Sequence, residues 1–121
     1  MKYGNKKVEV DGIEFDSKKE ERRYWELKLL QRAGKITDLE LQREFELIPA
    51  QYETFERYGK TGKRLQDGKR CVEQKCVYKA DFCYMQDGRL VVEDTKGVKT
   101  KDYIIKRKLM LERHGIKISE I

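Results

Sequence analysis

The chain has 121 residues, of which 41% are charged and 38% hydrophobic, and its formal net charge is +6. This length suits one domain, residues 1–121, with a modest hydrophobic core. No apolar run approaches the roughly 20 residues that a membrane-spanning helix requires, so we expect no membrane partner.

The cysteines and the N-terminal residues indicate a compartment. Cys71, Cys76 and Cys83 are odd in number and fit no zinc-binding spacing. The first residues lack the apolar core of a signal peptide. We therefore expect a cytoplasmic protein with reduced thiols, and its basic excess is compatible with a polyanionic partner.

Residues 1–15 predict a small N-terminal hairpin. Residues 1–6 are polar, and we expect them to be poorly ordered. From residue 7 onward apolar and polar residues alternate around Asp11-Gly12, a dipeptide typical of tight hairpin turns. This exposed hairpin is our candidate for pairing or exchange between subunits.

A helix is predicted from Ser17 to about Ala33, with Gly34 as its C-terminal stop. Its expected buried stripe consists of Tyr24, Leu27 and Leu30, widened by Trp25 and Leu29. Glu20 lies one turn before Tyr24, so it faces whatever the helix packs against.

Glu20 has two interpretations. Ser17 to Glu20 fits the capping box S-x-x-E, in which the glutamate bonds back to the amide of the N-cap residue. Taken alone, this structural role is the favoured one because the box is common. The alternative is a functional carboxylate near the start of the helix.

Residues 36–48 alternate and predict one or two strands, broken near Gln42-Arg43 and ended by Pro49. We assign Gln42 no catalytic role, because a glutamine here can simply bond a strand edge. Residues 51–70 then form a basic loop or a protruding hairpin. Cations near aromatic residues suit DNA, although a solvated loop explains them about as well. The expected DNA contacts in this segment are Lys60, Lys63, Arg64, Lys69 and Arg70.

Residues 78–96 predict two strands joined by a tight Asp-Gly turn. Counting outward from that turn places Asp81 opposite Asp94, and Lys79 opposite Lys96. Like charges that face each other destabilise a sheet, so a hairpin built only for stability avoids such pairs.

The period of two along a strand puts Asp94 and Lys96 on one face, and Glu93 and Thr95 on the other. Two carboxylates beside a lysine suit a divalent metal ion and an activated water, and oxygen ligands favour Mg²⁺. The alternative is a surface charge network in which lysines bridge Asp81 and Asp94 without any function. The like-charge penalty argues against it.

A second helix is predicted from about Thr100 to His114, capped by Thr100 and stopped by Gly115, and it is followed by a short strand within residues 116–121. Phosphate contacts are expected from Lys99, Lys101, Lys106 and Arg107. The order of hairpin, helix, strands, basic segment, two paired strands, helix and strand predicts an α+β domain with a mixed central sheet flanked by helices.

These pieces resemble the PD-(D/E)xK nuclease superfamily, which has a helix glutamate, a strand aspartate and then D-x-K in an αβββαβ order. Here they are Glu20, Asp81 and Asp94-Thr95-Lys96. The strings FDSKKE, KADF and VVEDTKG are similar to a family of small phage-encoded proteins near the endonuclease I-type Holliday junction resolvases, over about residues 5–118. One departure is Ala80, which stands where the superfamily has its proline.

The resemblance implies a restriction-endonuclease-like core and a metal-dependent DNA endonuclease. Asp81 and Asp94 would bind Mg²⁺, or Mn²⁺ as a substitute, with the Thr95 carbonyl. Lys96 would hold or help deprotonate the attacking water, and Glu20 would orient that water or bind a second ion. The reaction would be phosphodiester hydrolysis by in-line attack.

No recognition helix or zinc finger is evident, which favours structure-selective cleavage of branched DNA over sequence-specific restriction. A resolvase acting on two-fold junctions is expected to be a homodimer, and a phage-encoded one would act in the host cytoplasm. Two competing classes stay open. One is a non-catalytic nucleic-acid-binding module that keeps the fold, and the other is a basic protein-interaction adaptor without salt-dependent DNA affinity.

Overall fold

The computed structural model describes residues 7–121. Residues 1–6, for which we expected poor order, lie outside the described residues, as does that part of the hairpin predicted over residues 1–15. The elements follow the chain as β1 (Val8–Val10), β2 (Ile13–Phe15), α1 (Lys18–Arg32), β3 (Thr37–Leu41), β4 (Glu44–Ile48), β5 (Gln51–Tyr58), β6 (Arg64–Glu73), β7 (Cys76–Lys79), β8 (Phe82–Gln86), β9 (Arg89–Asp94), α2 (Lys101–His114) and β10 (Ser119–Glu120). This confirms the α+β class.

The central sheet has the strand order β10-β9-β8-β3, and it is mixed because β10 runs parallel to β9 while the other pairs are antiparallel. The hairpin β8–β9 turns at Asp87 and Gly88, whose φ angles of 52° and 76° are those that a type I′ turn needs. Its register pairs Cys83 with Val92, as counted from the turn. The local turn signal therefore predicted the register correctly.

The two faces of this sheet bury separate cores, one under each helix. Tyr24 and Leu27 of α1 pack with Phe82 and Tyr84 of β8. On the other face, Tyr103 and Met110 of α2 pack with Cys83 and Val92. Neighbouring residues along a strand point to opposite faces of the sheet. The side chains that follow Val92 along β9 therefore point alternately toward α1 and toward α2.

The helix ends confirm the expected caps. Ser17 and Thr100 accept hydrogen bonds from the amides three residues on, and Gly34 and Gly115 adopt left-handed φ angles of 77° and 67° just past the helices.

The predicted width of the stripe on α1 is wrong. Trp25 and Leu29 are 41% and 63% exposed, whereas Tyr24 and Leu27 are buried. The buried core on this side is only wide enough to cover one line of side chains, so apolar residues one position beyond that line remain in solvent.

The strand that carries Asp81 is not continuous. β7 pairs with β4, whereas β8 pairs with β9, and the chain bends between them at Asp81. Lys79 therefore lies opposite Glu44 and not opposite Lys96. The β8–β9 ladder ends with the Phe82–Glu93 pair, so Asp81 lies one residue beyond it rather than in a paired position opposite Asp94.

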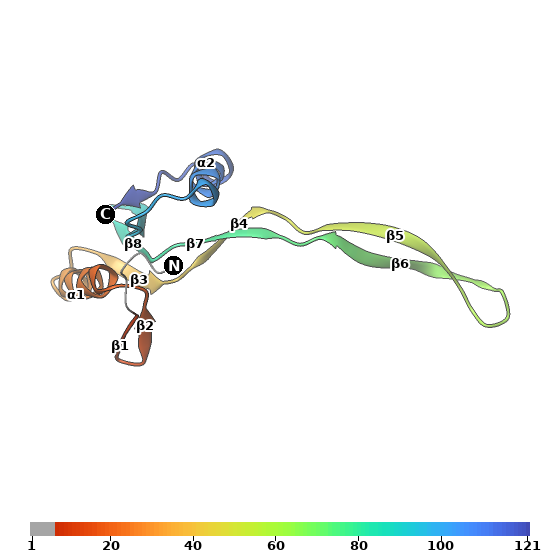
Figure 1. Cartoon of the computed structure of the whole chain (residues 1–121), viewed down its shortest axis with the longest axis horizontal. Coiled ribbons are helices and arrows are strands. Elements are labelled where there is room, and N and C mark those ends of the chain that lie inside the picture. Colours follow the sequence, from red (N-terminus) through yellow and green to blue (C-terminus); the bar gives the residue numbers. More distant parts are fainter. Residues whose placement is uncertain (1–6) are drawn as a thin grey trace.

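Residues 51–73 form a long two-stranded ribbon, β5–β6, which we call the arm; the rest of the described chain is the body. Figure 1 shows the arm extending far from the helices and the central sheet. Its strands pair with each other over their length and lie almost entirely in solvent. Of the two possibilities for residues 51–70, the protruding hairpin is confirmed.

Figure 1 also shows the N-terminal hairpin β1–β2 standing beside α1 and away from the arm. Its turn at Asp11 and Gly12 has positive φ angles of 53° and 76°. No helix formed by residues 7–121 is long and apolar enough to cross a membrane.

Candidate active site

The candidate site lies where the bend between β7 and β8 meets the end of β9. The amide of Asp81 donates to the carbonyl of Glu93 at 3.2 Å, which holds the bend against β9. Asp94 is the last residue of β9, and Thr95 and Lys96 follow it directly. Residues 81 and 94–96, which are separated in sequence, thereby meet at one edge of the sheet.

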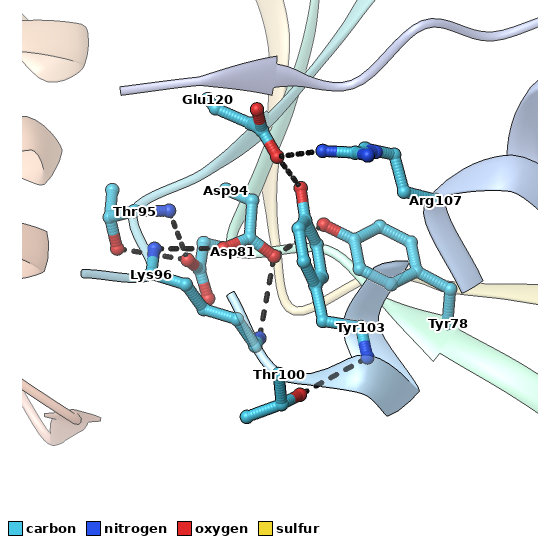
Figure 2. Close-up of polar contacts among 9 residues, drawn as sticks. All are labelled: Tyr78, Asp81, Asp94, Thr95, Lys96, Thr100, Tyr103, Arg107 and Glu120. Carbon is cyan, nitrogen blue, oxygen red and sulfur yellow. Dashed lines mark hydrogen bonds and ion pairs between the residues drawn. The ribbon is translucent and has the colours of Figure 1, made fainter. Parts of the chain in front are cut away.

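Thr95 holds the carboxylate of Asp81. Oδ2 of Asp81 accepts hydrogen bonds from the backbone N–H of Thr95 at 2.7 Å and from its hydroxyl at 2.9 Å. Figure 2 shows these contacts, with both groups of Thr95 directed at one carboxylate oxygen. Such bonds stabilise an ionised carboxylate and fix its orientation.

Asp94 is almost completely buried, with 1% of its surface exposed. Its Oδ2 accepts from the Tyr78 hydroxyl at 2.6 Å, and its Oδ1 accepts from the amide of Lys96 at 2.8 Å. Lys96 Nζ lies 3.4 Å from Oδ2 (Figure 2). Burial, followed by the bond to Asp94, raises the pKa of Tyr78, so its hydroxyl remains a donor to Asp94.

Glu20 is 4% exposed and lies in the first turn of α1. Its amide donates to Ser17 Oγ at 3.2 Å, but its Oε1 accepts from the amide of Asp16 at 3.3 Å rather than from that of Ser17. Burial, and then the charge of nearby Asp81, raise the pKa of Glu20 to about 8. The carboxylate therefore faces Asp81 as well as the helix start.

Glu93, the other acidic residue next to the D-x-K tripeptide, is committed elsewhere. Arg23 Nε and Nη2 donate to its two oxygens at 2.8 and 2.6 Å, and the Tyr84 hydroxyl also donates to it. Burial and the bond to Glu93 raise the pKa of Tyr84 to about 12. Glu93 thus joins β9 to α1, on the opposite face from Asp94.

Several of the candidate catalytic residues line a single pocket of about 210 Å³. Its walls include Glu20, Asp81, Thr95, Lys96 and Thr100, while Asp94 lies buried beside Lys96. Thr100 is the N-cap of α2, so the positive end of that helix also borders the pocket.

The expected DNA contacts differ in whether they already form an ion pair with an acidic residue. Lys99 and Arg107 form ion pairs with Glu120 at 3.4 and 3.2 Å. Figure 2 shows Arg107 and the Tyr103 hydroxyl at the same oxygen of Glu120. The remaining predicted contacts, on α2 and on the arm, are Lys101, Lys106, Lys60, Lys63, Arg64, Lys69 and Arg70. Within this set, Arg64 pairs with Asp67 and Arg70 with Glu53.

Sequence reasoning missed Tyr78, Arg23 and Tyr84. Arg23 follows Glu20 by three residues, a spacing that places both on one side of α1. Tyr78 and Tyr84 are strand residues whose partners are set by long-range pairing, so only their spacing to Asp81 could have drawn attention to them.

The donor set suits a hard divalent cation. Glu20, Asp81 and Asp94 would supply carboxylate oxygens and Thr95 would supply a carbonyl, the ligand types that Mg²⁺ takes. Burial, and after it the charge of Asp81, raise the pKa of Glu20, and a bound cation would counteract both by stabilising the ionised carboxylate. Among residues 7–121 no three or more acidic, histidine or cysteine side chains are already arranged around an ion position. Several of these oxygens accept protein hydrogen bonds instead.

Comparison with curated proteins and comparison with solved structures both find no match. One family model, described as "Protein of unknown function (DUF1064)", matches residues 1–119, which is nearly the whole chain. The chain therefore belongs to the DUF1064 family.

Proposed function

We propose that this protein is a metal-dependent endodeoxyribonuclease with a PD-(D/E)xK site, acting on branched DNA. The observation that carries the proposal is that Glu20, Asp81 and Lys96 border one pocket, with Asp94 buried beside Lys96. The mixed sheet with a helix on each face supports a restriction-endonuclease-like core.

The burial of these carboxylates argues for a function. Removing a carboxylate from water is costly unless it is paired and hydrogen-bonded. Glu20 and Asp94 are 4% and 1% exposed, which does not fit a solvated surface network of lysines and aspartates. Clustered, buried like charges of this kind are common at catalytic and metal-binding sites.

Each residue has a definable task in phosphodiester hydrolysis. Asp81, Asp94, the Thr95 carbonyl and Glu20 would hold Mg²⁺ or Mn²⁺, which would act as a Lewis acid toward the scissile phosphate. Lys96, whose side chain is 45% exposed at the pocket, would donate to the attacking water and to a phosphate oxygen.

DNA is supported by the surroundings of the pocket. The N-terminus of α2 presents free amides and a positive dipole end, which favour a phosphate group. Beyond the pocket, cations on α2 and on the arm would contact the phosphate backbone. Branched DNA is preferred because no element of the body has the form of a base-reading recognition helix, and the β1–β2 hairpin is our candidate for joining two subunits.

The test is a cleavage assay on a labelled four-way junction, a linear duplex and a single strand, each with Mg²⁺, Mn²⁺ or EDTA. The variants are Asp81→Asn and Asp94→Asn, which keep the side-chain shape. Asp87→Asn is the matched control, because it makes the same change at the opposite end of the β8–β9 hairpin, where Asn tolerates the positive φ angle.

We expect metal-dependent cuts, preferentially in the junction, that are retained by Asp87→Asn and reduced at least about 1000-fold by either site variant, since a metal ligand is lost. Tight, salt-sensitive DNA binding with no cleavage in either metal would contradict the proposal and favour the non-catalytic module. Affinity that does not change with salt would favour the protein-interaction adaptor.

A further inference from the structure

Gln42 has a backbone conformation that needs an explanation. It lies between β3 and β4 with a φ angle of +56°. Among residues 7–121 the other non-glycine residues with positive φ are Asp11, Asp38 and Asp87. Aspartate tolerates this region because its short side chain can bond the nearby backbone, whereas glutamine gains no such help. Disfavoured backbone conformations of this kind cluster at functional sites.

The backbone of Gln42 is tied directly to the candidate site. Its amide N–H donates to the carbonyl of Asp81 at 3.2 Å, so the turn between β3 and β4 lies against the bend that carries Asp81. This hydrogen bond therefore joins the backbone of Gln42 to the backbone of Asp81, the candidate metal ligand.

A second cavity, of about 590 Å³, opens at this point. Its walls include Gln42 and Lys79, and it shares Asp16, Asp81 and Lys96 with the pocket described above. The two cavities are therefore adjacent, and Asp81 lies between them.

Glu14, Asp16 and Asp81 line this cavity together with three lysines, and the part of the wall that suits an anion is the one formed by Gln42 and Lys79. Lys79 is exposed and takes part in none of the ion pairs found among residues 7–121, whereas Lys7 on the same wall is paired with Glu14. A neutral amide at position 42 can donate to a phosphate oxygen without competing with a cation for Asp81, as an arginine or lysine there would. A carboxylate at that position would repel the phosphate instead.

We propose that this second cavity is a phosphate subsite, in which Gln42 and Lys79 bind the DNA phosphate next to the scissile one. The inference rests on the proposed function and assigns the substrate position on one side of the cut. Gln42 and Lys79 are then binding residues that align the DNA backbone with Asp81 and Lys96.

The first test separates a functional Gln42 from a structural one. Gln42→Gly removes the side chain, and it also removes the energetic cost of the backbone conformation, because glycine adopts positive φ freely. We expect an unfolding midpoint that is unchanged or higher, together with cleavage about 10- to 100-fold slower, the size of effect expected when a hydrogen bond to a charged group is lost. Unchanged cleavage, or a loss that merely follows a lowered midpoint, would overturn the role of Gln42.

The second test identifies the phosphate. Lys79→Ser is compared with Lys35→Ser, an exposed lysine near the Asp87-Gly88 turn at the far end of the sheet. Neutral methylphosphonates are placed on either side of the mapped cut. At one of these positions we expect the methylphosphonate to slow cleavage by the unaltered protein and by Lys35→Ser about 10-fold, but to cause no further loss in Lys79→Ser. Independent, multiplicative losses at both positions would overturn the subsite.

A binding measurement in EDTA keeps this inference apart from the nuclease proposal. Lys79→Ser should bind duplex DNA about 5- to 10-fold more weakly than Lys35→Ser whether or not the protein cleaves DNA. Equal affinities of the two variants would refute the subsite, while absence of cleavage by the unaltered protein would refute only the nuclease proposal.

Discussion

The body and the arm use charged residues in opposite ways. In the body Glu20, Glu93 and Asp94 are buried, and each of their carboxylates has a hydrogen-bond partner within the described residues. In the arm charged side chains lie in solvent, and the partly buried residues are Phe55, Gly59 and Gly68. Burial makes an ion pair in the body sensitive to the loss of one partner, whereas exposure leaves the arm free to present charge to another molecule.

The arm is held by cross-strand contacts of its own. Phe55 pairs with Gly68, and a Cβ atom on Gly68 would lie 2.3 Å from the Phe55 ring, so any larger residue there would displace the ring. Arg70 lies over the same ring at 4.9 Å. The ribbon is thus built without the hydrophobic core of the body, and the two regions should respond separately to mutation.

The largest expected difference concerns two arginine–glutamate pairs of equal length. Arg23–Glu93 and Arg70–Glu53 are both 2.6 Å apart, but the glutamate side chains are 1% and 48% exposed. Arg23→Met strands a buried carboxylate and should lower the free energy of unfolding by about 3–5 kcal/mol. Arg70→Met should lower it by no more than about 1 kcal/mol. Denaturant unfolding measures both, and similar losses would contradict the contrast.

Removing the arm should affect DNA binding far more than folding. Ile48 and Cys76 are directly paired, so replacing residues 49–75 by Asn-Gly closes a two-residue hairpin between them. We expect about 100-fold weaker DNA affinity at low salt and a shallower salt dependence, because phosphate contacts are lost. The unfolding midpoint of the body should change little. A body that no longer folds would show that the two regions depend on each other.

The pH dependence of stability isolates the candidate site within the body. The pKa of Glu20 is raised from 4.5 to about 8 in the folded protein, chiefly by burial. Between these values the folded state holds a proton that the unfolded state has lost, so stability falls as pH rises, by at most about 1.4 kcal/mol per pH unit. Glu20→Gln removes this penalty and keeps the oxygen that faces Asp16.

In EDTA we therefore expect Glu20→Gln to stabilise the protein by about 1–2 kcal/mol at pH 8, with the gain nearly absent at pH 5. Glu21→Gln, one residue along α1 and outside the pocket, is the control and should show no such pH-dependent gain. Denaturant unfolding at both pH values gives the answer. A gain of equal size at pH 5 and pH 8 would mean that ionisation of Glu20 is not its cause.

Local signals predicted much of this structure, and long-range choices escaped them. The Asp87-Gly88 turn gave the register that brings Asp81 near Asp94, and the caps at Ser17 and Thr100 located both helices. The bend at Asp81 was missed because β7 pairs with β4, a choice that depends on a strand more than 30 residues away and not on nearby residues.

The candidate site shows the same division. Register placed Asp81, Asp94 and Lys96 near one another, whereas Glu20 joined them only through the resemblance to the nuclease superfamily. The Arg23–Glu93 bond spans 70 positions in the sequence, so no spacing rule predicts it. Whether residues 51–70 form a loop or a ribbon also depended on pairing between their two halves, which composition does not reveal.

The smallest expected effect distinguishes the tip of the arm, residues 59–63, from its shaft, the paired strands β5 and β6. The turn at residues 59–63 is closed by the bonds Gly59 N–H to Lys63 O at 2.8 Å and Gly62 N–H to Gly59 O at 2.9 Å. This turn therefore holds Lys60 and Lys63 in a defined position, and neither is paired with an acidic residue described in the structure. Arg70, nearer the body, already shares its charge with Glu53.

The double variant Lys60→Ser, Lys63→Ser should bind DNA about 5- to 10-fold more weakly at low salt, and the slope of log affinity against log salt should become shallower by about 2. Arg70→Ser should change that slope by less than 1, because Glu53 offsets part of its charge. Salt titrations of binding, with both proteins checked for unchanged unfolding midpoints, provide the measurement. A slope change for Arg70→Ser as large as that of the double variant would place the phosphate contacts along the shaft instead of at the tip.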